Sequence, residues 1–96
     1  MSDPARVALV VRPEENSQPF IDAIAHGAGH AVVIESNDEL PDDVGGLMVA
    51  GELGFTSSDS LPIALVEAID AGFPVLGIGW GMHALNIALG GELPIA

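Results

Sequence analysis

Several residue types are missing or scarce in this sequence, and each absence narrows the function. There is no cysteine, so the chain can form no disulfide, no thiolate metal site and no cysteine nucleophile of its own. Lysine is also absent, and two arginines face fourteen Asp and Glu residues, for a formal net charge of −12. A field of that sign repels phosphates, so we expect no nucleic-acid partner and no anionic membrane surface.

Long apolar runs are missing as well. No run reaches the ~18–20 residues that a membrane-spanning helix needs. The sequence begins Met1-Ser2-Asp3 and shows no basic segment followed by an apolar one, so we expect no signal peptide and a cytoplasmic location. Yet 49% of the residues are hydrophobic and the mean hydropathy is +0.47, which is apolar for a domain of 96 residues. We expect a protein interface to cover part of that apolar surface.

The acidic charge has two interpretations. It can attract a basic partner or a cationic substrate, or it can serve solubility alone, as in an organism with an acidic proteome. The same two interpretations apply to a local cluster formed by Asp38, Glu39, Asp42 and Asp43, which is either a docking site for a basic partner or a hydrated loop.

Apolar runs alternate with amphipathic stretches along the chain. The runs predict four buried strands, over residues 7–11, 31–34, 46–50 and 74–78. Three helices are predicted as well. The first is capped by Ser17 and ends at Gly27 to Gly29, the second is capped by Asp59 or Ser60 with Pro62 in its first turn and closes at Gly72, and the third spans 81–89 before Gly90-Gly91.

This order of elements predicts a single α/β domain over residues 1–96. We expect a flavodoxin-like three-layer sandwich with a mostly parallel sheet of four strands, or five, in the order 2-1-3-4. The loops after the third and fourth strands would then lie at the carboxyl edge of the sheet, where such folds place their binding sites.

The segment from Pro74 to Gly91, PVLGIGWGMHALNIALGG, carries the chemical information. It predicts a buried strand, a glycine-dense sharp turn and a helix, which is the setting of a nucleophile elbow, G-x-Nuc-x-G. Gly77 and Gly81 occupy the two flanking glycine positions, and Gly79 stands in the nucleophile position.

These residues resemble the elbow of class I glutamine amidotransferases, and most of all the gamma-glutamyl-gamma-aminobutyrate hydrolase-like branch. That branch carries G-I-C-x-G-x-Q, a helix rich in leucine and asparagine, and a Gly-Gly pair; this chain has GIGWGMH and then ALNIALGG. Residues 46–51 resemble the family's strand leading to its oxyanion-hole glycine, and residues 64–74 resemble the helix and turn before the elbow. The resemblance covers nearly the whole chain and is diagnostic over residues 46–91.

Departures from the family pattern bear on activity. Gly79 replaces the catalytic cysteine and has no side chain that could attack a carbonyl. His83 replaces a family glutamine, and the family's catalytic histidine and its acidic partner belong to a segment later than Ala96. The resemblance therefore implies a truncated domain without amidotransferase activity of its own. Because glycine tolerates strained backbone, we expect the elbow to keep its shape, with a positive φ at Gly79.

Three functions follow from the resemblance. The first is an inactive module that forms homo-oligomers or serves as an accessory or regulatory subunit of a partner enzyme in glutamine, glutamate or amine metabolism. The second is a module that binds an amino-acid-like or anionic ligand in the former active-site cleft, and the third is a hydrolase whose site is shared between subunits. Candidate cleft residues are Gly51, Glu52, Gly79, Trp80 and His83, and candidate interface residues are Trp80, Val75, Leu76 and Leu85.

Some of these residues have a purely structural alternative. Trp80 is either a ligand lid or interface anchor, or a packing residue. His83 either lines the cleft or bonds the backbone of its helix. His26 and His30 have a spacing that suits a metal on a helix, but glycines lie between them. Glu52 and Asp59 are either paired carboxylates or solvated loop charges. We expect no metal and no cofactor.

Overall fold

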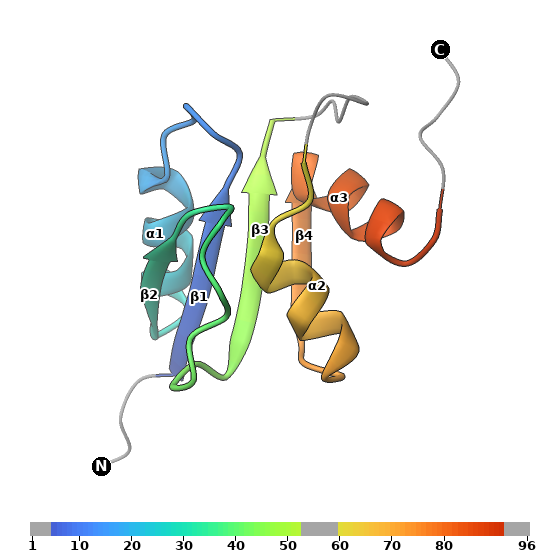
Figure 1. Ribbon diagram of the computed structural model, residues 1–96. Coiled ribbons are helices and arrows are strands. Elements are labelled where there is room, and N and C mark those ends of the chain that lie inside the picture. The colour runs from blue at the N-terminus through green and yellow to red at the C-terminus, as the bar shows by residue number, and fades with distance from the viewer. Residues whose placement is uncertain (1–4, 53–59, 92–96) are drawn as a thin grey trace.

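Alternating strands and helices fill the described part of the chain, residues 5–52 and 60–91 of a computed structural model (Figure 1). The helices have eight or nine residues, and within those ranges none has the length and apolar composition needed to cross a membrane. In chain order the elements are β1 (Ala5–Val11), α1 (Gln18–His26), β2 (Gly29–Ile34), β3 (Gly46–Gly51), α2 (Ile63–Asp70), β4 (Val75–Gly79) and α3 (Trp80–Ala88).

The four strands form one sheet in the order β2-β1-β3-β4, and every neighbouring pair is parallel. This confirms the predicted fold class and strand order. Because the strands are parallel, the ends of β1, β3 and β4 meet at one carboxyl edge, where Gly51 of β3 lies opposite Gly79 of β4. The last residues of these three strands are therefore neighbours in space although they are far apart in the sequence.

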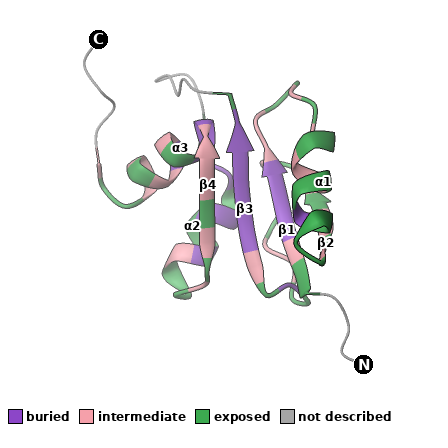
Figure 2. Ribbon diagram, turned by 180° about the vertical axis from the view of Figure 1, so that it is seen from behind, coloured by how far each residue is buried: buried purple, intermediate pink, exposed green. Residues whose placement is uncertain are grey.

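Helices lie on both faces of the sheet. On one face α1 packs on β1 and β2 through Ile24, and on the other face α2 and α3 pack on β1, β3 and β4. In Figure 2, which shows the α1 side, no helix of the described chain lies over β3 and β4. Leu76 of β4 is accordingly 54% exposed. The larger core thus lies on the α2–α3 side, and the α1 side is only half covered.

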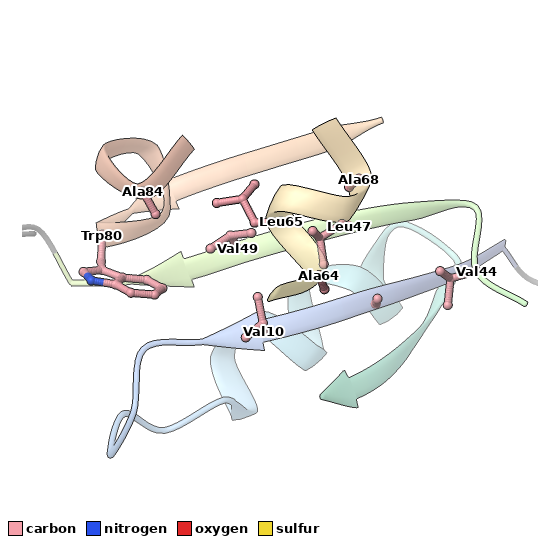
Figure 3. Packing of buried hydrophobic residues seen from close by; sticks show 10 residues of the cluster. Val10, Val44, Leu47, Val49, Ala64, Leu65, Ala68, Trp80 and Ala84 are labelled. Atoms are coloured by element: carbon pink, nitrogen blue, oxygen red, sulfur yellow. The ribbon is translucent and has the colours of Figure 1, made fainter. Parts of the chain in front are cut away.

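The larger core joins the two inner strands, β1 and β3, to α2 and α3 (Figure 3). Its largest side chain is Trp80, which is 1% exposed although it lies at the first position of α3. Leu65 of α2 and Val49 of β3 are fully buried in the same cluster. This packing fixes α3, and with it the turn between β4 and α3, against the centre of the sheet.

The start of the second helix differs from the sequence prediction, and the predicted N-cap of the first is confirmed in position. We predicted Pro62 in the first turn of the second helix, but α2 begins at Ile63 and Pro62 takes the N-cap position without a side-chain cap. The backbone N–H of Ile63 instead donates to the carbonyl oxygen of Ser36, at 2.9 Å, so the loop after β2 supplies an acceptor there. Ser17 does hold the N-cap position of α1, but its side chain makes no capping bond. Asp59 lies outside the described residues.

Replacing Leu65 by alanine should lower the free energy of unfolding by about 2–5 kcal/mol, because the side chain is fully buried and its loss leaves a cavity. The neighbouring Val66→Ala is the control, since Val66 is 42% exposed and its truncation should cost at most about 0.5 kcal/mol. Chemical denaturation followed by circular dichroism measures both. Equal losses for the two variants would contradict the packing described here.

Candidate functional site

A sharp turn joins β4 directly to α3 at the carboxyl edge of the sheet. Its central residue is Gly79, which ends β4 and caps α3 with φ 58° and ψ −118°. A residue with a Cβ adopts such angles only at a cost of about 1–3 kcal/mol, whereas glycine populates positive φ freely. The predicted positive φ at Gly79 is confirmed, and the chain has a strand–turn–helix elbow at this point.

The two flanking glycines allow the first turn of α3 to lie directly on the sheet. A Cβ on Gly77 would stand 2.6 Å from the carbonyl oxygen of Gly81, and a Cβ on Gly81 would overlap the carbonyl oxygen of Val49 in β3. Both are contacts with backbone, which cannot swing aside as a flexible side chain can. Glycine is therefore required at positions 77 and 81, because the first turn of α3 lies so close to the backbones of β4 and β3.

The space in which a nucleophile would stand is occupied by the end of β3. A Cβ built on Gly79 overlaps the carbonyl oxygen of Gly51, and it lies 3.2 Å from the carbonyl carbon of Gly51 and 3.4 Å from that of Glu52. Gly79 thus lacks a reactive atom, and the main chain of β3 also excludes any side chain at this position. A cysteine could return here only if the end of β3 moved.

The loop after β1 contributes a carboxylate to the same edge. Both carboxylate oxygens of Glu15 accept the backbone N–H of Glu52, at distances of 3.0 and 2.9 Å. The sequence analysis missed Glu15 because it placed candidate residues only after the third and fourth strands. The predicted strand order 2-1-3-4 could have indicated Glu15. In that order the gap between β1 and β3 is the switch point of the sheet, and ligands of such folds bind at the switch point.

The structure brings together three of the five predicted cleft residues. Gly51, Glu52 and Gly79 meet at the elbow. Trp80 adjoins them through its Cβ, but its ring is buried in the core, which favours the packing alternative. His83 is half-buried on α3, three residues beyond Trp80.

Two cavities open at the carboxyl edge. One, of about 410 Å³, is bordered by Glu52 together with Glu14, Glu15, Asn16, Pro19 and Phe20. The other, of about 400 Å³, lies between the ends of β1 and β2 and includes Arg12, Ser17 and Ser36 in its lining. Gly51, Gly79, Trp80 and His83 border neither cavity. Among the described residues, these two cavities therefore lie beside the elbow, towards α1 and β2.

The two histidines of the predicted pair lie on different elements. His26 ends α1 and His30 lies in β2, so the helical spacing that suits a metal does not apply. Within residues 5–52 and 60–91, no group of three or more His, Asp or Glu side chains is arranged to hold a metal ion. In the acidic loop, Asp43 forms an ion pair with Arg6 at 3.0 Å, and both side chains are largely exposed.

Of the four predicted interface residues, one is clearly exposed. Leu76 is 54% exposed on β4, Val75 and Leu85 are half-buried against the larger core, and Trp80 is inside it. A partner on this side of the molecule would therefore contact Leu76 first.

The parallel sheet and the strand–turn–helix elbow define a flavodoxin-like α/β domain of the class I glutamine amidotransferase type. More closely, the chain belongs to the peptidase C26 family, whose family model matches residues 48–95. The match includes most of β3, all of α2, the elbow and α3, and it confirms the amidotransferase-like resemblance. No curated protein and no solved structure gave a significant match to the chain.

The elbow makes a direct prediction for Gly79→Ala, with Gly72→Ala as the matched control. Both glycines have positive φ, 58° and 69°, but an added Cβ on Gly72 meets no heavy atom within 4 Å. Gly72→Ala should therefore cost about 1–2 kcal/mol, from backbone conformation alone. Gly79→Ala should cost about 1–3 kcal/mol more, because the methyl group also collides with β3.

Urea denaturation of both variants gives the two free energies of unfolding. A Gly79→Ala variant as stable as Gly72→Ala would show that β3 does not fill the nucleophile position.

Proposed function

We propose that the chain is a catalytically inactive glutamine amidotransferase-like module that acts by assembly, with itself or with a partner enzyme. The observation that carries the proposal is Gly79, which takes the nucleophile position of a preserved elbow. Covalent catalysis of amide cleavage needs a nucleophile at that position together with a base. Here the position offers no attacking atom, and the carbonyl of Gly51 fills the space beside it.

Within the family, we assign the chain to the gamma-glutamyl-gamma-aminobutyrate hydrolase-like branch. The support is the resemblance of the GIGWG turn and of the following ALNIALGG helix to that branch. The structure places these residues on β4, the elbow and α3. The proposed partner enzyme follows from the same resemblance, as one that handles glutamine, glutamate or an amine.

The edge of β4 is the proposed surface for assembly. Among the described residues β4 pairs only with β3, and its sequence, VLGIG, carries no charge that would oppose pairing with another strand. The opposite edge strand, β2, contains His30 and is followed at once by Glu35. The β4 edge is therefore the better template for a second copy of the chain.

An apolar groove adjoins that edge on the α1 side of the sheet. It measures about 400 Å³, and none of the described residues in its lining is charged; they include Val7, Ile24, Met48, Val75 and Leu76. With a net charge of −12, two copies repel each other over most of their surface. Two copies of the chain that meet at this groove and the neighbouring strand edge would therefore repel each other least.

The purified chain should release no ammonia from glutamine and cleave no gamma-glutamyl amide above the rate in buffer. Gly79→Cys should be equally inactive, since the end of β3 leaves no room for the new side chain. An active class I amidotransferase assayed in parallel verifies the method. Turnover by the wild-type chain at micromolar concentration would refute the proposal and would favour a site shared between subunits.

The mass of the chain in solution tests assembly. By light scattering coupled to gel filtration at micromolar concentration, we expect a dimer or a larger assembly. Leu76→Lys should convert it to monomer, because the change places a charge in the middle of the β4 edge. Val33→Lys is the matched control. Val33 is 52% exposed on the opposite edge strand, so the Val33→Lys variant should have the same mass in solution as the wild-type assembly.

Two results would count against the β4 edge. A wild-type chain that is monomeric at these concentrations would contradict self-assembly. Dissociation by Val33→Lys alone would show that the interface lies on β2 and not on β4.

A further inference from the structure

The N–H of Glu52 is the first backbone donor after β3, immediately beyond the residue whose carbonyl fills the nucleophile position. It is not open to a ligand, because both oxygens of the Glu15 carboxylate accept from it, at 3.0 and 2.9 Å. We infer that Glu15 is an internal ligand that closes the former active-site cleft against carbonyl and carboxylate groups. This inference deepens the proposed function, on which it depends for the identity of the elbow.

The loop that carries Glu15 is held in a special conformation. Glu14 has φ 72°, a value that a residue with a side chain adopts only where its surroundings hold it. The N–H of Glu15 donates to the carbonyl oxygen of Arg12 at 3.1 Å, and the N–H of Arg12 donates to the carbonyl oxygen of Ala50 at 3.0 Å. The loop is thus tied to the end of β3 by its main chain, and the Glu15 side chain completes the attachment.

The residue at position 51 fits this arrangement. A Cβ on Gly51 would lie 2.8 Å from Oε2 of Glu15 and 3.0 Å from the Cβ atoms of Arg12 and Trp80. A side chain at position 51 would displace the Glu15 carboxylate or press on the Cβ atoms of Arg12 and Trp80. The carboxylate therefore lies against the edge of the sheet at Gly51.

Closure by Glu15 has a chemical consequence for ligands. A carbonyl or carboxylate group needs hydrogen-bond donors, and the Glu52 donor is already engaged by a group of the same chemistry. A second anion beside Glu15 would also meet the charges of Glu14 and Glu52, which border the adjoining cavity. Glu15 therefore opposes the binding of anionic, amino-acid-like ligands at the Glu52 N–H.

Hydrogen exchange of the Glu52 amide, measured by NMR on the full chain, tests the contact. In Glu15→Ala the Glu52 amide should exchange at least about tenfold faster than in wild type, which corresponds to about 1.4 kcal/mol of local protection. Glu14→Ala is the matched control, since Glu14 is the adjacent carboxylate of the same loop and no bond from it to Glu52 is present among the described contacts. In that control the Glu52 rate should stay unchanged.

Core amides separate a local effect from general unfolding. The ratio of the Glu52 rate to the Leu9 rate should rise in Glu15→Ala, because Leu9 is fully buried in β1. Should Glu15→Ala fail to fold, Glu15→Gln replaces it, since the glutamine keeps the size but loses the charge and one acceptor. The ratio should then rise by a smaller factor. An unchanged ratio in the folded variant overturns the inference.

Titration with sodium acetate tests closure against ligands. The Glu52 amide resonance of the wild-type chain should not shift more than with equal sodium chloride, up to tens of millimolar. A saturable shift specific to acetate would overturn the inference, because the donor would then be available. Neither result depends on the ammonia assay or on the mass in solution, so failure here is distinguishable from failure of the proposed function.

Discussion

The structure depends on the close approach of three backbone segments at the carboxyl edge of the sheet. The end of β3, the end of β4 and the first turn of α3 come within direct contact, and they do so through Gly51, Gly77, Gly79 and Gly81. A Cβ at 77, 79 or 81 would meet main-chain atoms, and backbone cannot yield as a side chain can. Trp80 directly follows Gly79, and its side chain is buried in the larger core. The elbow and that core therefore form a single packed unit.

The same constraint determines which atoms occupy the nucleophile position of the elbow. A nucleophile elbow holds a reactive side chain in a strained conformation, and that side chain needs free space above the turn. In this molecule glycine relieves the strain, and the carbonyl of Gly51 takes the space. The glycine at the nucleophile position and the backbone that fills the space beside it are thus two aspects of one geometry.

Charge and apolar surface are distributed unevenly over the molecule. Several carboxylates form contacts of their own: Asp43 pairs with Arg6, Glu67 of α2 accepts the N–H of Leu40, and Glu15 accepts that of Glu52. The exposed Arg6–Asp43 pair contributes little stability, at most about 1 kcal/mol. Among the described residues, the β4 edge and the lining of its groove carry no charge. This separation keeps an acidic chain compatible with assembly at one uncharged face.

The order of the elements and the positive φ at Gly79 could be predicted from the sequence, because local patterns of apolar residues and glycines control them. The strand order 2-1-3-4 was predicted from the right-handed crossovers typical of α/β folds. The start of α2, where Ser36 supplies the acceptor, and the contact of Glu15 with Glu52 became evident only from the folded chain. Glu15 and Glu52 are 37 positions apart, and they meet because β1 and β3 are neighbours in the sheet. The burial of Trp80 and the overlap of Gly51 with the nucleophile position have the same origin: both depend on distances between backbone segments, and no local pattern encodes such distances.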